Sequence, residues 1–154
     1  MSDKIRGALF NALGELDGLT VLDAFAGSGA LSFEAVSRGA QSVIAIENDH
    51  QAQKTIEANI KALSLISDIK LIKTSAGAWL DTSDETFDVI LCDPPYDDLQ
   101  PNLLIRLAER ANPDGLIVYS LPPGTGVPLS ITNYKLVTSK DYGDSQLVFY
   151  RRIA

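Results

Sequence analysis

Short, almost uninterrupted apolar runs alternate with helical segments along most of the sequence. The run at 89–92, Val-Ile-Leu-Cys, is apolar throughout. A strand of this kind needs cover on both faces, which is typical of a parallel sheet with helices packed on each side. The predicted strands cover residues 20–25, 42–46, 69–73, 87–92, 116–120, 134–138 and 146–150. The sequence therefore predicts an α/β fold with a mainly parallel, seven-stranded sheet.

Between these strands, apolar residues recur at helical spacing. Ser2 is a suitable N-cap for the first helix, and Gly14 is a suitable stop. The predicted helices cover residues 5–13, 31–38, 49–63, 76–80 and 101–111. Only residues 139–145 separate the last two strands, which is too short for a helical crossover, so this C-terminal pair is predicted to be antiparallel. The turn-rich segment 122–128 predicts a surface loop.

The composition limits what such a chain can be. Its 154 residues suit one domain spanning 1–154. With 13 Lys and Arg against 20 Asp and Glu, the net charge of −7 excludes a polycationic protein that wraps nucleic acid, so any polynucleotide contact must be local. The single cysteine, Cys92, excludes a disulfide framework, and no metal site is predicted. We expect a cytoplasmic protein, because no apolar run is long enough for a membrane span and no signal sequence is visible.

The first predicted strand ends at Asp23 and leads into a glycine-rich loop at 24–29, Ala-Phe-Ala-Gly-Ser-Gly. In an open parallel sheet, ligands bind beyond the carboxyl ends of the strands. Gly27 and Gly29 allow the backbone to approach a ligand closely, and the next helix presents unpaired N–H groups. Eighteen residues past Gly29, Glu47 follows the second strand, where a carboxylate can accept both hydroxyls of a ribose. Loop and acid together predict a cofactor that contains adenosine.

Two residues favour a cationic cofactor over a dinucleotide. Asp23 would repel a pyrophosphate, and Ser32 stands where the dinucleotide fingerprint has a third Gly or Ala. The sequence also lacks the Gly-Lys-Ser/Thr motif that binds the phosphates of a nucleoside triphosphate. S-adenosylmethionine carries an ammonium and a sulfonium and no phosphate, so it suits an acidic loop better. A nicotinamide-dependent oxidoreductase is the alternative.

The fourth predicted strand runs directly into Asp93-Pro94-Pro95-Tyr96, at the same edge of the sheet as the glycine loop. Two consecutive prolines fix the backbone and donate no N–H, so the turn offers only acceptors beside the Asp93 carboxylate. An exocyclic amino group of a base has two N–H bonds, one for Asp93 Oδ and one for the Pro94 carbonyl. Tyr96 adds a flat face on which the base can stack. The turn therefore predicts a site for the amino group of a nucleobase.

These motifs together resemble the class I S-adenosylmethionine-dependent amino methyltransferases, and more closely the bacterial RsmD family of 16S ribosomal RNA guanine-N2 methyltransferases. The resemblance covers nearly the whole chain. It rests on Ser2-Asp3-Lys4-Ile5-Arg6, Leu9-Phe10-Asn11, the segment from Leu22 to Leu31, Glu47, Asp93-Pro94-Pro95-Tyr96 and Tyr142-Gly143-Asp144. The fold that it implies is Rossmann-like, with a mainly parallel seven-stranded sheet, an antiparallel C-terminal strand pair and helices on both faces.

The resemblance also implies how the cofactor is held. Glu47, with Asn48 beside it, would bind the ribose of S-adenosylmethionine. Family members usually place an Asp on the adenine amino group, whereas this chain has Ser75, so Ser75 Oγ and the backbone of Ala76 would hold the adenine. The residues implied for the methionine part are those of the first strand end and loop: Asp23, Ala24, Phe25, Gly27 and Gly29.

The substrate that the resemblance implies is the N2 amino group of a guanine in 16S rRNA, in the small ribosomal subunit or an assembly intermediate. We expect the protein to act as a monomer. Family members carry a basic, RNA-contacting extension before the first helix, and this extension is expected to be absent here, because Met1 leads straight into Ser2. Tyr142 is a further candidate wall of the base pocket. The residues implied for catalysis are those of the proline turn: Asp93, Pro94, Pro95 and Tyr96.

Two other functions stay open on the residues alone. The acceptors of the proline turn would serve any exocyclic amine, so methylation of adenine N6 or cytosine N4 in DNA is one alternative. No target-recognition domain is visible in 154 residues, which counts against it. The other alternative is a cofactor-binding module of ribosome assembly without catalytic activity.

Overall fold

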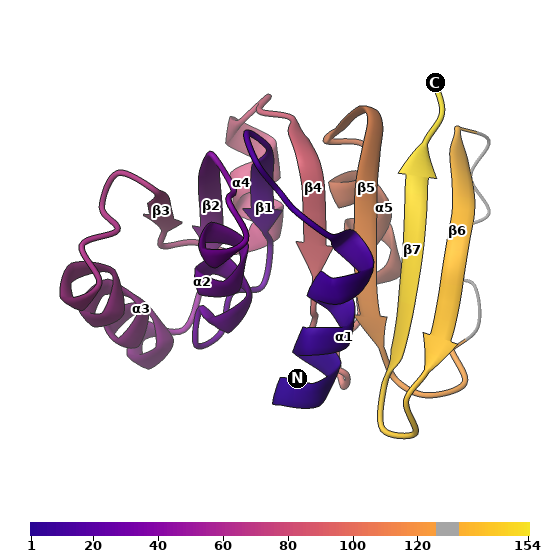
Figure 1. Cartoon of the computed structure of the whole chain (residues 1–154), viewed down its shortest axis with the longest axis horizontal. Helices are drawn as coiled ribbons and strands as arrows, with labels where there is room; N and C mark the ends of the chain where they lie inside the picture. Colours follow the sequence, from indigo (N-terminus) through magenta and orange to yellow (C-terminus); the bar gives the residue numbers. More distant parts are fainter. Residues whose placement is uncertain (126–132) are drawn as a thin grey trace.

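A computed structural model of the chain describes residues 1–125 and 133–154, in which helices and strands alternate (Figure 1). The helices are α1 (Asp3–Leu13), α2 (Ala30–Ser37), α3 (His50–Ala62), α4 (Ala76–Thr82) and α5 (Pro101–Ala108). The strands are β1 (Thr20–Asp23), β2 (Ser42–Ile46), β3 (Ile69–Ile72), β4 (Phe87–Cys92), β5 (Ala111–Leu121), β6 (Tyr134–Asp141) and β7 (Gln146–Arg152). Within the described ranges, no helix combines the length and the apolar character that crossing a membrane requires.

The strands form one sheet in the order β3-β2-β1-β4-β5-β7-β6. β1 pairs in parallel with β2 and β4, and parallel pairing continues outward to β3 and β5. β7 is antiparallel to both β5 and β6, so the predicted fold and its antiparallel C-terminal pair are confirmed. After β3, the chain crosses back to β4 on the other side of β1. Sheets of this type bind ligands beyond the strand ends at such a switch point.

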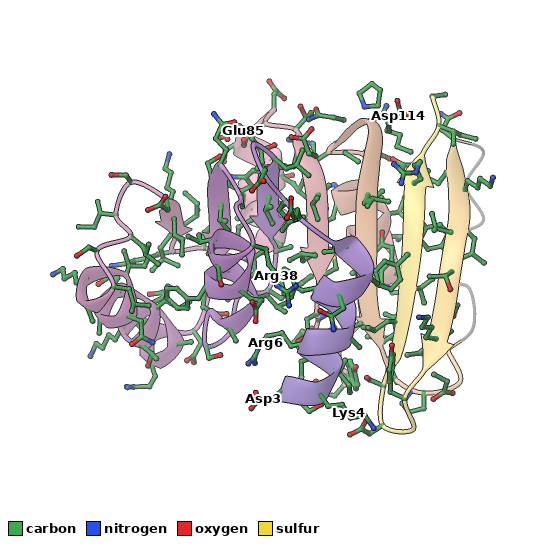
Figure 2. The ribbon with its side chains drawn as sticks, in the orientation of Figure 1. Asp3, Lys4, Arg6, Arg38, Glu85 and Asp114 are labelled. Atoms are coloured by element: carbon green, nitrogen blue, oxygen red, sulfur yellow. The ribbon has the colours of Figure 1, made fainter. Side chains whose placement is uncertain are left out.

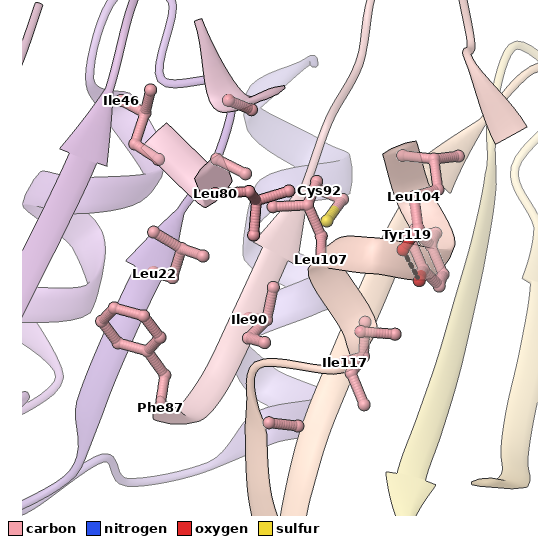
Figure 3. Packing of buried hydrophobic residues seen from close by; sticks show 14 of the residues in the cluster. Leu22, Ile46, Leu80, Phe87, Ile90, Cys92, Leu104, Leu107, Ile117 and Tyr119 are labelled. Carbon is pink, nitrogen blue, oxygen red and sulfur yellow. Dashed lines mark hydrogen bonds between the residues drawn. The ribbon is translucent and has the colours of Figure 1, made fainter. Parts of the chain in front are cut away.

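Helices cover both faces of the sheet, which makes two hydrophobic cores. Figure 3 shows the first, in which Leu80 of α4 and Leu104 of α5 lie with Ile90 of β4. The second core holds Phe10 of α1 and, from β4, Val89. Successive residues of β4 thus enter opposite cores. This double burial explains why the run at 89–92 is apolar throughout, since each such side chain contributes about 1.5–3 kcal/mol when it leaves water.

An N-cap stabilises the start of α1, and Arg38 contacts its side. Ser2 Oγ accepts a hydrogen bond from the Ile5 N–H at 3.2 Å, as predicted for an N-cap. Arg38, which follows α2, lies beside α1 in Figure 2. Its guanidinium carbon is 5.9 Å from the centre of the Phe10 ring, and its Nη2 donates to Asn11 Oδ1 at 3.3 Å. These contacts hold α1 against the sheet, with its first residues toward the strand ends that bind ligands.

Several element boundaries differ from the predictions. α5 ends at Ala108, whereas the sequence predicted a helix to residue 111, because Ala111 already pairs with Phe87 and opens β5. A bulge then shifts the register before the predicted strand at 116–120. β1 ends at Asp23 and not at residue 25, while β6 continues to Asp141. Of the predicted loop at 122–128, residues 126–128 lie outside the described residues.

Candidate active site

A cavity of about 730 Å³ opens at the carboxyl ends of the central strands. Its volume is in the range of small-molecule and cofactor sites. Most of the predicted site residues line it, although they come from four separate strand ends. These lining residues are Ala24, Phe25, Gly27, Glu47, Asn48, Ser75, Ala76, Asp93, Pro94, Pro95 and Tyr96. Two predicted residues, Asp23 and Gly29, lie outside the cavity lining.

The glycine loop is fixed over the switch point by the strands on either side. The Ala24 N–H donates to the Leu91 carbonyl of β4 at 3.1 Å, and the Ala26 N–H donates to the Ile46 carbonyl of β2 at 2.9 Å. Gly29 ends the loop with a φ of 86°, and a Cβ there would lie 2.9 Å from the Phe33 ring. Glycine is therefore required where the loop turns into α2. The backbone at Gly27 is left to form part of the cavity wall.

Asp23 is fully buried behind this loop. Its Oδ2 accepts a hydrogen bond from Ser32 Oγ at 2.7 Å, which gives a structural reason for serine at this position of α2. Its Oδ1 has no hydrogen-bond partner among the described residues. Burial raises the pKa of this carboxyl to about 7; the Ser32 bond opposes the rise, and the charges of Asp93 and Glu47 add to it. A buried acceptor with a spare lone pair suits a donor or a cation, and it opposes a phosphate.

Glu47 joins the glycine loop to the start of α3. Its Oε1 accepts from the Gly27 N–H at 2.6 Å, and its Oε2 accepts from the Asp49 N–H at 2.8 Å. Gln53 of α3 also donates to the Glu47 carbonyl at 2.9 Å, so the backbone at this corner is held as well. Each carboxylate oxygen keeps lone-pair capacity beyond these single bonds. The orientation is therefore suitable for two further donors, such as the two hydroxyls of a ribose.

Ser75 and Ala76 form the next part of the wall, after β3. Ser75 is the N-cap of α4, and its Oγ accepts from the Ala78 N–H at 3.2 Å. A hydroxyl oxygen that accepts one bond can still donate its own hydrogen. The corner thus offers a hydroxyl donor and the backbone of Ala76, where the resemblance placed the adenine of the cofactor.

The Asp-Pro-Pro-Tyr turn forms the opposite wall. Burial raises the pKa of Asp93, and the chain's amino group, at 4.0 Å from Asp93 Oδ2, and Ser120 oppose that rise. Pro94 is buried, whereas Tyr96 is 40% exposed, so its ring is accessible from the cavity. The Tyr96 hydroxyl and Ser120 Oγ lie 2.9 Å apart and share a hydrogen bond. The turn places its acceptors beside an aromatic ring that Ser120 anchors.

Sequence reasoning missed Ser120 as a partner of this turn and Asp144 and Ser145 as cavity residues. Asp144 and Ser145 line the cavity from the turn between β6 and β7. Tyr142, which the sequence suggested as a wall, packs instead against the core on the α1 side. The Tyr-Gly-Asp motif at 142–144 lies in the turn that reaches the cavity. The residues of this turn that line the cavity are Asp144 and Ser145.

The strand order 3-2-1-4-5-7-6, a glycine loop at the switch point, an acidic residue after β2 and an Asp-Pro-Pro-Tyr turn after β4 define a class I methyltransferase. A family model described as "Conserved hypothetical protein 95" matches residues 1–151. The chain belongs to this family, which is the RsmD family.

Individual relatives agree with this assignment. "Putative rRNA methyltransferase YlbH" of Bacillus subtilis is 29% identical over 98% of this chain and 86% of its own length. "Ribosomal RNA small subunit methyltransferase D" of Escherichia coli K12 is 28% identical over 99% of this chain and 79% of its own. The solved structure of "Putative methyltransferase yhhF" from Escherichia coli has a TM-score of 0.91 at 27% identity, covering 99% of this chain and 88% of that one.

Proposed function

We propose that this chain is an S-adenosylmethionine-dependent methyltransferase that methylates the exocyclic N2 amino group of a guanine in 16S rRNA. One observation carries the proposal: the acceptor-only turn of Asp93 and Pro94 lines the same cavity as the residues that suit a cationic nucleoside cofactor. The names of the relatives, which include rRNA methyltransferases, support RNA as the substrate class. The proposed partner is the small ribosomal subunit or one of its assembly intermediates.

S-adenosylmethionine fits the site in three places. Asp23 lies behind the loop and outside the cavity lining, and the lone pair that its Oδ1 keeps suits a positive charge on the methionine side. Glu47, already oriented by the Gly27 and Asp49 amides, suits the ribose hydroxyls. The hydroxyl of Ser75 and the backbone of Ala76 would hold the adenine, which is supported by the position of both residues in the cavity lining. The cofactor supplies a methyl group that its sulfonium makes electrophilic.

The task left to the protein is to orient the attacking nitrogen. Asp93 Oδ and the Pro94 carbonyl would each accept one N–H of the amino group, which directs its lone pair toward the methyl carbon. Orientation of this kind can supply about 7–11 kcal/mol of a barrier. The Asp93 carboxylate would offset the positive charge that methyl transfer develops on this nitrogen. Burial raises the pKa of Asp93, so its carboxylate binds a proton more readily than an exposed carboxylate does. Asp93 would therefore accept the released proton and pass it to solvent.

Tyr96 would hold the base in plane. Its hydroxyl is tied to Ser120 Oγ, which fixes the ring while leaving 40% of the residue exposed. A base stacked on such a ring gains about 1–3 kcal/mol. Since the target base must reach this turn, it would be extruded from any helix that contains it, as in other enzymes that act on a base.

The proposal is tested by incubating the protein with labelled S-adenosylmethionine and isolated small subunits, followed by nuclease digestion and mass spectrometry of the nucleosides. N2-methylguanosine is the expected product. Asp93→Ala should abolish methyl transfer while binding of S-adenosylhomocysteine, measured by calorimetry, stays within about twofold. Asp97→Ala is the matched control, because Asp97 is an exposed acid of the same segment and lies outside the cavity lining. Equal loss of transfer and binding in Asp93→Ala would give Asp93 a structural role.

The acceptor pair of Asp93 and Pro94 also suits the amino groups of adenine and cytosine, so DNA is the second candidate substrate. The same assay with DNA separates the two. Methylated adenine or cytosine in DNA, without N2-methylguanosine in RNA, would replace the proposed function. Cofactor binding without transfer to either polymer would favour the non-catalytic module.

A further inference from the structure

The turn between β6 and β7 brings two side chains to the cavity from the far end of the sequence. Its backbone is closed by a hydrogen bond from the Tyr142 N–H to the Ser145 carbonyl at 2.8 Å. A second bond, from the Gly143 N–H to Asp141 Oδ1 at 2.8 Å, fixes the bend. The Asp144 and Ser145 side chains line the cavity together with Asp93 and Tyr96. The turn is therefore a defined wall of the proposed base pocket.

Ser145 has a hydroxyl that is only weakly bound in this wall. The residue is 5% exposed, and its Oγ makes no hydrogen bond of standard geometry among the described residues, although it interacts with the Tyr96 hydroxyl, whose pKa it lowers. A buried hydroxyl without a full-strength partner costs stability, so its placement in a ligand cavity indicates a stronger partner that arrives with the ligand. Ser145 can donate to an acceptor on the incoming base.

Asp144 adds a second carboxylate to the cavity that Asp93 and Tyr96 line. Burial is the main cause of the raised pKa of the Tyr96 phenol; the charges of Asp93 and Asp144 add to the rise, and hydrogen bonds from Ser120 and Ser145 oppose it. With Asp98, which also lines the cavity, the base end of the site carries several acceptors. Such a wall attracts a base edge that has N–H donors and repels one that has lone pairs.

The bases differ at the atom next to the amino group. Guanine has the N1–H donor beside its N2 amino group, and then the O6 acceptor. Adenine has a lone pair at N1 beside its N6 amino group, and cytosine has one at N3 beside N4. A carboxylate next to the amino-binding acceptors therefore favours guanine alone, because it would face a lone pair in each of the other two bases.

We propose that Asp144 and Ser145 select guanine, with the Asp144 carboxylate accepting the N1–H and the Ser145 hydroxyl donating to O6, while Asp93 and Pro94 hold the N2 amino group. This inference rests on the proposed function. It assigns the choice of base to the β6–β7 turn, and it leaves the orientation for methyl transfer to the proline turn.

The test uses 2-aminopurine, which keeps the N2 amino group but has a lone pair at N1 and no O6. Once mass spectrometry has located the methylated guanosine, the corresponding RNA is prepared with either guanosine or 2-aminopurine at that position. kcat/KM is measured on both RNAs for the wild-type protein and for the variants Asp144→Asn, Ser145→Ala and Asp97→Asn. Asp97→Asn is the matched control, since it removes an exposed charge that is outside the cavity lining.

The wild-type protein should prefer guanosine strongly. In Asp144→Asn, the amide can turn its NH₂ toward the N1 lone pair, so the preference should fall by roughly 10- to 100-fold, as expected for loss of a hydrogen bond to a charged group. Ser145→Ala should slow guanosine methylation by up to roughly tenfold and leave 2-aminopurine unaffected, because the latter has no O6. Asp97→Asn should behave as the wild type.

Each outcome has a separate meaning. If the wild-type protein forms no N2-methylguanosine, the proposed function fails. If it does, but Asp144→Asn keeps the wild-type preference and Ser145→Ala slows both RNAs equally, the selection by this turn is refuted. Binding of S-adenosylhomocysteine and the thermal midpoint of each variant show that the fold and the cofactor site are intact. A variant that fails this check is replaced by Asp144→Ser or Ser145→Cys, which keep the side chains small.

Discussion

The Glu47 carboxylate holds two loops with its two oxygens and, in the proposed function, two ribose hydroxyls as well. We predict that Glu47→Ala weakens the binding of S-adenosylhomocysteine by roughly 10- to 100-fold, since hydrogen bonds to a charged group contribute about 1.5–3 kcal/mol. The Gly27 and Asp49 amides also lose their acceptors in this variant. Titration calorimetry measures the effect. Unchanged affinity would remove Glu47 from the ribose site.

Asp23 gives the protein a pH-dependent stability. Burial is the main cause that raises its pKa from 3.8 to about 7. The native state then keeps a proton between about pH 4 and pH 7 that the unfolded chain has released. The free energy of unfolding therefore falls as the pH rises through this window, by about 4 kcal/mol at most from this group.

We predict that Asp23→Asn removes this component, so its free energy of unfolding falls less than that of the wild type between pH 4 and pH 7. Urea unfolding at four pH values across this window measures both slopes. Asp97→Asn is the control and should run parallel to the wild type, because Asp97 is exposed. If Asp23→Asn also ran parallel, the buried carboxyl would titrate at its ordinary pH.

At the scale of elements, two tyrosines fasten α5 to the sheet. The Tyr119 hydroxyl of β5 donates to the Leu104 carbonyl at 2.7 Å in a fully buried position (Figure 3). The Tyr134 hydroxyl of β6 donates to the Ala108 carbonyl, also at 2.7 Å, in a half-buried position. The two bonds are chemically alike and differ in their access to water.

Removing one hydroxyl at a time should therefore have unequal effects. We predict that Tyr119→Phe lowers the free energy of unfolding by about 1–2 kcal/mol, because water cannot replace the lost donor, and that Tyr134→Phe lowers it by less than about 1 kcal/mol. Urea denaturation of the two variants gives the comparison. If Tyr134→Phe lowered the free energy of unfolding more than Tyr119→Phe, access of water to the hydroxyl would not determine the loss of stability.

Most helices and strands were predictable, because the local pattern of apolar residues determines them. The run at 89–92 must be buried on both faces wherever it lies, so strand and parallel sheet follow from it. The end of α5 was not predictable, because Ala111 leaves the helical path to pair with Phe87, which is 24 positions away in the sequence. Propensity at 109–111 carries no information about that partner, and the boundary is set by the sheet.

At the scale of the whole molecule, some site residues were predictable from local sequence, and others depend on how distant strands pair. Asp23, Glu47 and Asp93 each follow a parallel strand, and the carboxyl ends of such strands meet at one edge, so their convergence was predictable. Asp144 and Ser145 reach the cavity only because β7 lies antiparallel beside β5, while Ser120 of β5 is buried and bonds to Tyr96 from behind the cavity wall. The sequence predicted an antiparallel pair but did not place it beside β5, so the base-selecting wall became visible only in the assembled sheet.

Binding at this edge should stabilise the whole fold, because the cavity is lined from α1 to the β6–β7 turn. S-adenosylhomocysteine at about 100 times its dissociation constant should add about 2.7 kcal/mol to the free energy of unfolding. For a chain of 154 residues this predicts a rise in Tm of about 5–10 °C, measured by differential scanning fluorimetry. NAD⁺ at the same concentration should leave Tm unchanged, because its pyrophosphate would meet the loop backed by Asp23. A shift with NAD⁺ and none with S-adenosylhomocysteine would assign the cavity to a dinucleotide.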